Sequence, residues 1–203
     1  MLQTGEKRRE KGRESKPEEK DAEGLVNDQR VKMKKNILIT GLPGTGKTTL
    51  VMKLSAALEN LHPIGFYTTE IREGGERVGF ELVSLAGRKG LLSHIDFQSA
   101  FRVGKYKVDV KGFEDFLDEI PFLDSPTRLI IIDEIGKMEC LSARFRSLLK
   151  EILDSEKWLI ATIAQKGGGP IAEMKKRRDT QLFTVTPTNR DALFSEIFQL
   201  FRF

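Results

Sequence analysis

The sequence has few of the features that mark secreted, membrane-spanning or strongly nucleic-acid-binding proteins. Cys140 is its single cysteine, so the chain can form no internal disulfide, and this cysteine usage is typical of a reducing compartment. No apolar run approaches the roughly 18 residues that a membrane-spanning helix needs, and the first residues lack the apolar stretch of a secretory signal. The 34 lysines and arginines barely exceed the 30 aspartates and glutamates, so the net charge of +4 does not indicate a nucleic-acid partner. We therefore expect a cytoplasmic monomer with neither a membrane nor a nucleic acid as its partner.

Residues 1–32 differ in composition from the rest of the chain. They are rich in charges of both signs and have almost no apolar side chains, so they cannot bury enough surface to offset the entropy of ordering them. Met33, Lys34 and Lys35 then lead directly into the first apolar run. We expect a charged, disordered and dispensable extension over residues 1–32, followed by one compact domain over residues 33–203.

A glycine-rich turn follows that apolar run and opens a helix. Residues 41–48 read G-L-P-G-T-G-K-T and match the pattern G-x-x-x-x-G-K-[ST] in full. The three glycines let backbone N–H groups converge on a phosphate, and the helix adds the free N–H groups of its first turn. In this pattern Lys47 reaches the β- and γ-phosphates, and Thr48 provides a hydroxyl ligand for Mg²⁺. The segment predicts a site for a nucleoside triphosphate.

A second diagnostic segment ends in two carboxylates. Residues 129–132 are apolar, which indicates a buried strand, and Asp133 and Glu134 follow at its carboxyl end. Asp133 is placed to hold Mg²⁺ through a water molecule. Glu134 is placed to orient or deprotonate the water that attacks the γ-phosphate, with a structural role as the alternative. The next predicted strand ends in Thr162, at a position from which a side chain can sense the γ-phosphate.

The chain beyond residue 35 alternates between strand and helix patterns. Gly74 and Gly75 separate two β-rich runs and predict a tight antiparallel hairpin. The alternation predicts an α/β fold: a three-layer P-loop NTPase of the RecA-like, additional-strand type, with a mostly parallel central sheet plus an antiparallel hairpin. We place the strand over residues 158–162 between the strand before the loop and the acidic strand. The expected helices cover residues 47–58, 113–120, 141–153, 172–178 and a segment from about 189, and the expected strands cover residues 36–40, 65–71, 78–85, 128–133, 158–162 and 182–185.

Four further side chains are candidates for contacts with the nucleotide. Asn189 and Arg190 can meet the edge of a base or stack on its ring, but Asn189 can equally cap the last helix. Arg72 and Arg177 are candidates for an arginine that compensates charge in the transition state, with solvated ion pairs as the alternative. The N-K-x-D element of guanine-specific P-loop proteins is absent, so we expect low selectivity among bases.

The candidate site therefore has three sets of residues. The catalytic set is Glu134, Lys47, Arg72 and Arg177. The metal set, for Mg²⁺, is Thr48 and Asp133. The nucleotide-binding set is Gly41, Leu42, Pro43, Gly44, Thr45, Gly46, Lys47, Thr48, Thr49, Leu129, Ile130, Ile131, Ile132, Asp133, Glu134, Ile135, Gly136, Asn189 and Arg190.

Several of these segments resemble one known family, the small cancer-related nucleoside-triphosphatases, also called THEP1-type NTPases. The resemblance runs from residue 36 to about residue 197 and is carried by the glycine-rich loop with G-F-Y-T at 65–68, R-V-G-F at 77–80 and D-E-I-G-K-M-E at 133–139. It implies slow, Mg²⁺-dependent hydrolysis of ATP, GTP and other nucleoside triphosphates to diphosphate and phosphate. The sequence departs from the family at Thr69, where an acidic residue is common, and in the glycine-richer loop over residues 166–170.

The residues leave two other functions open. A phosphotransferase similar to nucleoside or nucleotide kinases would pass the γ-phosphoryl group to a small acceptor under an arginine-rich lid, which residues 175–178 resemble weakly. An RNA-associated nucleotide switch would couple hydrolysis to a partner, and the same basic run could contact phosphates. Hydrolysis is the function that the sequence favours.

Overall fold

A computed structural model of the protein describes residues 1–2 and 34–201, and the chain divides into two units, 1–32 and 33–203. The expectations for residues 1–32 therefore lie almost wholly outside the described residues. None of the described helices is both long and apolar enough to pass through a membrane.

The helices are α1 (Lys47–Ala57), α2 (Val110–Asp118), α3 (Ala143–Asp154), α4 (Pro170–Lys176) and α5 (Arg190–Gln199), with 3-10 turns η1 (Glu59–Leu61) and η2 (Glu139–Leu141). The strands are β1 (Asn36–Thr40), β2 (Ile64–Glu73), β3 (Glu76–Ser84), β4 (Lys89–His94), β5 (Arg102–Val103), β6 (Tyr106–Val108), β7 (Leu129–Ile135), β8 (Trp158–Ile163) and β9 (Thr180–Thr184).

The described strands form one nine-stranded sheet in the order β5-β6-β4-β3-β2-β7-β8-β1-β9. The strands β2, β7, β8, β1 and β9 run parallel to one another. From β2 outward, β3, β4, β6 and β5 continue the sheet in antiparallel pairs, and the β2–β3 turn falls at Gly74 and Gly75. This confirms the predicted α/β class with its mostly parallel sheet and antiparallel hairpin. It also confirms that β8 lies between β1 and β7.

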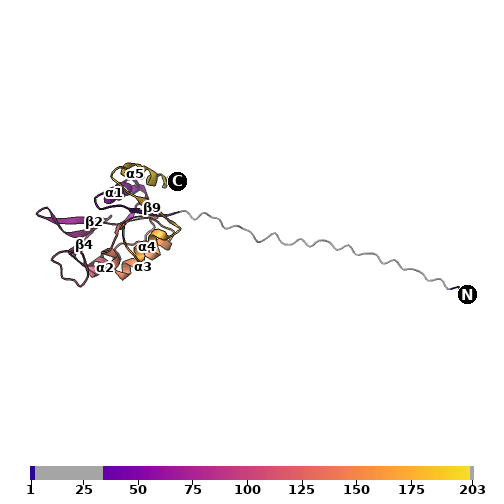
Figure 1. Ribbon diagram of the computed structural model, residues 1–203, viewed down its shortest axis with the longest axis horizontal. Coiled ribbons are helices and arrows are strands. Elements are labelled where there is room, and N and C mark those ends of the chain that lie inside the picture. Colours follow the sequence, from indigo (N-terminus) through magenta and orange to yellow (C-terminus); the bar gives the residue numbers. More distant parts are fainter. Residues whose placement is uncertain (3–33, 202–203) are drawn as a thin grey trace. The chain divides into compact units, whose positions relative to one another are not determined.

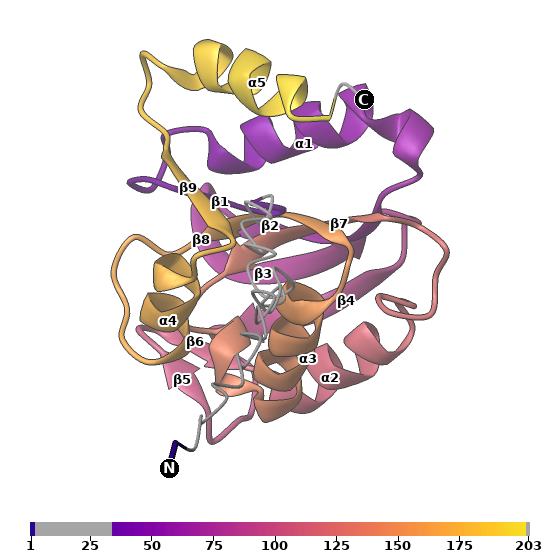
Figure 2. The ribbon, with the colours of Figure 1, turned by 90° about the vertical axis from the view of Figure 1, so that its right-hand side faces the viewer.

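Helices cover both faces of the sheet (Figure 2), with α1 and α5 on one face and α2, α3 and α4 on the other. Successive side chains of a strand point to opposite faces, and β1 shows the result. Ile37 and Ile39 pack in an apolar cluster with Leu50 of α1, whereas Leu38 packs in a second cluster with Phe145 of α3. Each face of the sheet therefore has its own apolar core.

Phe66 of β2 is the centre of an aromatic cluster that holds two helices on the sheet. Its ring meets Phe113 and Phe116 of α2 edge to face, with centroids 5.8 Å apart in each pair. Phe145 of α3 lies 5.2 Å from Phe113. Burial of each such side chain contributes roughly 1.5–3 kcal/mol, so the cluster stabilises the packing of α2 and α3 on β2.

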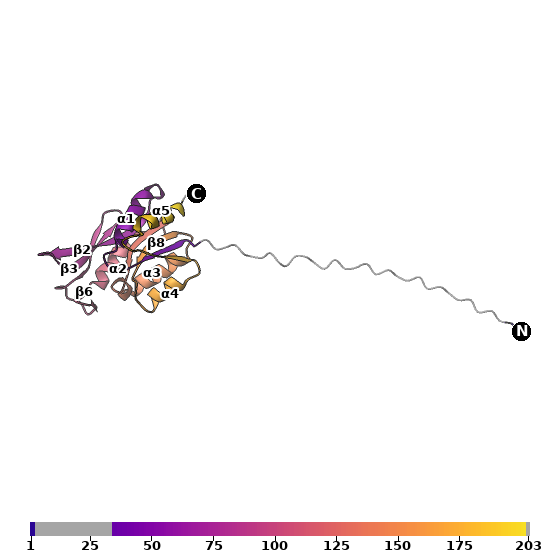
Figure 3. The same cartoon turned by 45° about the horizontal axis from the view of Figure 1, so that its top comes forward.

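The carboxyl ends of the parallel strands bring the candidate site together at one edge of the sheet. Thr162 of β8 lies beside Ile39 of β1, and Tyr67 of β2 lies opposite Asp133 of β7. The glycine-rich loop after β1, the end of β7 and the loop after β8 therefore share this edge. The hairpin of β2 and β3 reaches past it, because β2 continues to Glu73, and Figures 1 and 3 show the hairpin extending away from the helices.

The sequence patterns did not predict the outer strands. β5 has two residues and β6 has three, which is too short for an alternation of apolar and polar residues to be recognised. These strands form because they pair with each other and with β4, which in turn pairs with β3. β4 (Lys89–His94) was not predicted either. The remaining helices and strands differ from the predicted ranges only by a few residues at their ends.

Candidate active site

The glycine-rich loop between β1 and α1 is shaped by the segment after β9. A Cβ atom on Gly41 would lie 2.5 Å from the carbonyl oxygen of Val185, so a residue with a side chain does not fit there. Gly46 has a φ of +89°, which favours glycine, at the boundary where α1 begins. The Nζ atom of Lys47 donates hydrogen bonds to the carbonyl oxygens of Gly41 at 3.2 Å and Leu42 at 3.1 Å. The ammonium group therefore lies against the loop backbone that a triphosphate would contact.

Asp133 near the end of β7 has one carboxylate oxygen that is paired and one that is not. Thr162 of β8 donates a hydrogen bond to Oδ1, while Oδ2 is buried and has no hydrogen-bond partner among the described residues. Burial raises the pKa of Asp133, and hydrogen bonds from Thr162 and Thr48 together with the charge of Lys47 oppose that shift. Leaving a buried carboxylate oxygen unpaired is unfavourable, and a cation held beside Thr48 would compensate it.

The donors at this position fit Mg²⁺. The Oδ2 atom of Asp133 and the hydroxyl of Thr48 are hard oxygen donors, and Thr48 lies close enough to lower the pKa of Asp133. Mg²⁺ in nucleotide sites is bound by one or two protein groups together with substrate phosphates. The predicted metal set of Thr48 and Asp133 is thus brought together by the fold.

Thr162 has a different role from the one expected. Its side chain is fully buried, and its hydroxyl donates to Asp133. It therefore orients the carboxylate instead of facing a phosphate. The position of Thr162 near the end of its strand did not reveal this, because the direction of a terminal side chain depends on the neighbouring strand.

Glu134 follows Asp133 and is half-buried beside the turn after β7. Burial raises the pKa of Glu134, the charge of Asp133 raises it further, and the charge of Lys47 lowers it. In the turn itself, a Cβ atom on Gly136 would lie 2.8 Å from Oε2 of Glu139 and 3.0 Å from Oε1 of Glu134. Glu134 therefore shares one electrostatic environment with Lys47 and Asp133.

Glu139 is a third carboxyl group near the site, and it was not in the predicted sets. Its side chain is buried, and its Oε2 atom accepts a hydrogen bond from the backbone N–H of Gly136 at 3.0 Å. Burial raises the pKa of Glu139 to about 8, so the group is mostly neutral at pH 7. Glu139 stabilises the turn that follows Glu134. A glutamate is usually exposed, so the sequence offered no signal of this buried position.

The apolar β7 residues of the predicted nucleotide-binding set belong to the core. Their side chains are at most 1% exposed and alternate between the two apolar clusters, so they offer no surface to a ligand. Their inclusion in the nucleotide-binding set was wrong. They act instead by fixing β7, which positions Asp133. These residues are Leu129, Ile130, Ile131, Ile132 and Ile135.

Arg177 lies at the edge of the sheet opposite to the glycine-rich loop. Its Nη2 atom pairs with Asp154 and Asp179, each at 2.8 Å. Asp154 ends α3 shortly before β8 begins, and Asp179 directly precedes β9. Strands of five or six residues such as these span roughly 17–20 Å, so a side chain held at their amino ends does not reach the γ-phosphate. The hypothesis that Arg177 acts as an arginine finger was wrong.

Arg72 is held within the β2–β3 hairpin. Its Nε atom donates to Glu70 at 2.9 Å, and its Nη1 atom donates to the carbonyl oxygen of Gly75 at 2.9 Å. Arg77 of β3 also donates to Glu70, at 2.6 Å. Hydrogen bonds from Arg77 and then Arg72 lower the pKa of Glu70. A catalytic role of Arg72 stays a prediction.

Asn189 and Arg190 lie where α5 begins, close to the glycine-rich loop. The side chain of Asn189 accepts a hydrogen bond from the N–H of Thr186 at 2.8 Å and donates to the carbonyl oxygen of Thr184 at 2.9 Å. It therefore closes the turn after β9 and does not cap α5, which corrects the capping alternative. The guanidinium of Arg190 lies against the loop, since a Cβ atom on Gly46 would be 2.9 Å from its Nη1 atom. Contact of either residue with a base stays a prediction.

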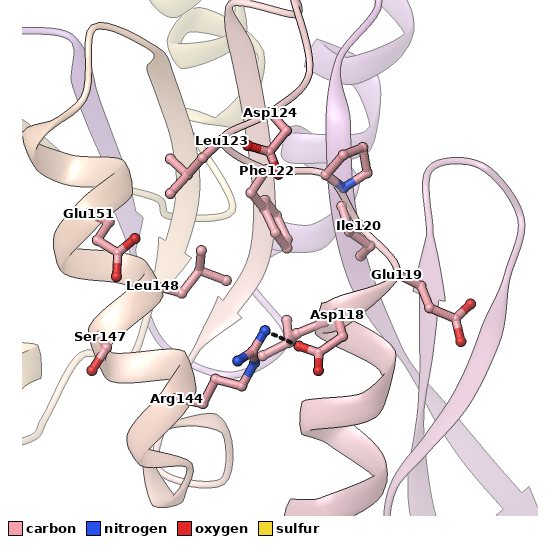
Figure 4. Close-up of a pocket in the computed structure, with 12 residues that line it drawn as sticks. Asp118, Glu119, Ile120, Phe122, Leu123, Asp124, Arg144, Ser147, Leu148 and Glu151 are labelled. Atoms are coloured by element: carbon pink, nitrogen blue, oxygen red, sulfur yellow. Dashed lines mark ion pairs between the residues drawn. The ribbon is translucent and has the colours of Figure 1, made fainter.

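A cavity of about 480 Å³ lies between the segment after α2 and helix α3 (Figure 4). Arg144 of α3 forms an ion pair with Asp118 there, and Leu123 and Leu148 contribute apolar surface. Neither the glycine-rich loop nor Asp133 lines this cavity. It is therefore distinct from the candidate active site.

The fold and the site define a class of protein. A phosphate-binding loop between β1 and α1, an acidic residue near the end of β7 and a strand between β1 and β7 characterise P-loop nucleoside-triphosphate-binding proteins of the additional-strand type. A family model described as NTPase matches residues 36–198. The chain belongs to this NTPase family.

Curated relatives and solved structures agree with this assignment. The chain is 48% identical over 171 residues to the nucleoside-triphosphatase THEP1 of Thermotoga petrophila, covering 82% of this chain and 93% of the relative. It is 38% identical over 183 residues to the human cancer-related nucleoside-triphosphatase, covering 81% of this chain and 95% of the relative. The crystal structure of THEP1 from the hyperthermophile Aquifex aeolicus matches with a TM-score of 0.75 and 37% identity, over 83% of this chain and 99% of that one. The family resemblance found in the sequence is thereby confirmed.

Proposed function

We propose that this protein is an Mg²⁺-dependent enzyme that hydrolyses ATP, GTP and other nucleoside triphosphates to the diphosphate and phosphate. The observation that carries the proposal is the arrangement at Asp133. A buried carboxylate oxygen without a partner lies beside Thr48 and Lys47, and Glu134 shares their electrostatic environment. The relatives named as nucleoside-triphosphatases support the same activity for this chain.

The role of each residue follows from its chemistry. The loop N–H groups and Lys47 bind the β- and γ-phosphates. Thr48 and Asp133 would hold Mg²⁺, which when bound supplies positive charge against the phosphate oxygens. Glu134 orients the attacking water and accepts its proton. Water forms the new bond to the γ-phosphorus, the bond to the β–γ bridging oxygen breaks, and the diphosphate and phosphate leave.

The structure favours hydrolysis over transfer to a small acceptor. A phosphotransferase would need basic residues in a lid above the phosphates, and residues 175–178 were the candidates for one. Lys175 instead donates to the carbonyl oxygens of Ala164 and Gln165, and Arg177 is paired with two aspartates at the opposite edge of the sheet. Diphosphate formation and phosphate release, measured with and without candidate nucleosides and RNA, test this choice. Diphosphate formed in excess of phosphate when a nucleoside is present would indicate transfer, and phosphate release stimulated by RNA would indicate a switch.

Base selectivity gives a direct test of the proposed substrate range. No guanine-reading element is present, and the nearby polar groups of Asn189 are used by backbone atoms of the turn after β9. We expect kcat/KM values for ATP and GTP within about tenfold, a difference of roughly 1.4 kcal/mol in transition-state binding. Steady-state phosphate release with each nucleotide measures this ratio. A preference above roughly a thousandfold would reveal a dedicated base pocket and contradict the proposal.

The catalytic unit that we propose is residues 33–203, acting as a cytoplasmic monomer that takes nucleoside triphosphates and binds no membrane or nucleic acid. The single cysteine and the small net charge support this proposal. A protein that starts at Met33 should keep its kcat within about twofold of the full chain, because residues 1–32 lack the apolar surface for a stable contact. Phosphate release and sedimentation measure activity and mass together. Lost activity, or a dimer, would contradict the respective part of the proposal.

A further inference from the structure

The proposed hydrolysis calls for more positive charge than the residues assigned so far supply. Negative charge spreads over the γ-phosphoryl oxygens in the transition state, and P-loop enzymes commonly add a cation to the loop lysine. Arg177 is ion-paired at the opposite edge of the sheet, and Arg72 is bound to Glu70 within the hairpin. Another cation at the edge where the site lies would meet this need.

The loop between β8 and α4 begins inside the site. The hydroxyl of Thr40, the last residue of β1, donates to the carbonyl oxygen of Ile163 at 3.0 Å. The N–H of Ala164 donates to the carbonyl oxygen of Ile135 at 3.1 Å. Thr40 directly precedes the glycine-rich loop, and Ile135 directly follows Glu134. The loop therefore starts between the phosphate-binding loop and the water-activating carboxylate.

Lys175 of α4 fixes the first residues of this loop. Its Nζ atom donates to the carbonyl oxygens of Ala164 at 2.6 Å and Gln165 at 2.9 Å. The next residue, Lys166, is exposed, and three glycines follow it. Within the part of the chain that the structure describes, no hydrogen bond or ion pair engages the side chain of Lys166. The loop thus carries a free ammonium group between a fixed backbone and a segment with wide conformational freedom.

We propose that Lys166 is the second cation of the site and contacts the γ-phosphoryl oxygens as the bond to the diphosphate breaks. Lys166 is two residues beyond Ala164, so their Cα atoms are at most about 7 Å apart, and the lysine side chain adds a flexible four-carbon stem. The glycines that follow allow the loop to fold over the phosphates while Lys175 keeps its start in place. This inference rests on the proposed function, and it assigns a catalytic role to the loop that departs from the family pattern.

Substitution at Lys166 tests the proposal through both turnover and binding. In Lys166→Ala, kcat for ATP should fall by roughly 10²–10³, whereas the affinities for ATP and for ADP should stay within about threefold. The affinity for ADP in the presence of Mg²⁺ and aluminium fluoride, which mimics the phosphoryl group in transfer, should fall by a factor similar to that in kcat. Lys166→Arg keeps the charge and should recover most of both quantities. Lys176→Ala, an exposed lysine at the end of α4, is the matched control and should behave as wild type.

The outcomes separate this inference from the proposed function. If wild-type protein releases no phosphate from any nucleoside triphosphate, both are overturned. If wild type is active, two results for Lys166→Ala overturn the inference alone. The variant is as active as wild type, or its kcat falls while its affinity for ADP in the presence of Mg²⁺ and aluminium fluoride does not. Two rival cations lie at this edge: Lys137, which is exposed three residues after Glu134, and Arg190, whose guanidinium lies against the glycine-rich loop. If Lys137→Ala or Arg190→Ala loses both kcat and affinity for ADP with aluminium fluoride while Lys166→Ala is unaffected, the role belongs to that residue and the inference is overturned.

Discussion

Replacement of Glu134 by glutamine is expected to lower kcat for ATP by roughly 10²–10⁴ while the affinity for ATP stays within about threefold of wild type. Glutamine keeps the size of the side chain but is not a base, and Asp133, Thr48 and the glycine-rich loop still bind the nucleotide. The variant should therefore retain ATP through gel filtration for longer than wild type. Phosphate release measures turnover, and equilibrium titration with ATP measures affinity. Glu196→Gln, an exposed glutamate of α5, is the matched control.

Two results would contradict the role of Glu134. Near-wild-type turnover in Glu134→Gln would mean that the residue is structural. The alternatives are poor, since Glu139 is buried with a pKa raised to about 8 and Glu70 is bound by two arginines. Loss of ATP binding would instead mean that Glu134 belongs to the metal site, and that the division of roles between Asp133 and Glu134 is different from the one proposed.

Replacement of Lys47 by alanine is expected to abolish measurable turnover and to weaken ATP binding. Its ammonium group lies against the carbonyl oxygens of Gly41 and Leu42, where it can reach the β- and γ-phosphates, and no other described lysine lies on the loop itself. Thr48→Ala should also lose turnover, because it removes the hydroxyl that we propose as a direct ligand of Mg²⁺. Phosphate release and calorimetric titration with ATP check both effects.

Lys53→Ala is the control for the Lys47 variant. Lys53 is on the same helix but exposed, and it pairs at the surface with Asp191 at 3.7 Å. Such a surface pair contributes little, so Lys53→Ala should keep turnover and affinity close to wild type. Wild-type turnover in purified Lys47→Ala would overturn the assignment of the phosphate-binding loop.

Much of the fold and the centre of the site could be predicted because their signals are local. The glycine-rich loop and the acidic strand each combine a motif with the strand or helix that supports it, and the structure has those elements as expected. Parallel strands place their carboxyl ends at one edge, so the two motifs had to meet once both strands were recognised. The hairpin at Gly74 and Gly75 was also a local signal, because tight turns of this kind select glycine.

The parts that could not be predicted depend on neighbours far away in the sequence. The short strands β5 and β6 exist only through pairing. The buried state of Glu139 and the partner of Thr162 depend on how β7, β8 and the following turn pack together. Residue type alone suggested a different environment in each case, since glutamate is usually exposed and a terminal threonine can point in several directions.

The sequence by itself determined the phosphate-binding loop and the two adjacent carboxylates at the end of a buried strand, on which the proposed binding of Mg²⁺ and activation of water depend. The tertiary structure alone decided at which edge of the sheet Arg177 and Lys166 lie. Arg177 and Lys166 are only eleven positions apart, yet Arg177 is fixed at the amino ends of the strands and Lys166 follows the carboxyl end of β8. The physical reason is distance. A cation stabilises a phosphate by direct contact over a few ångströms, whereas the two ends of a strand, and so the two edges of the sheet, are much farther apart than that.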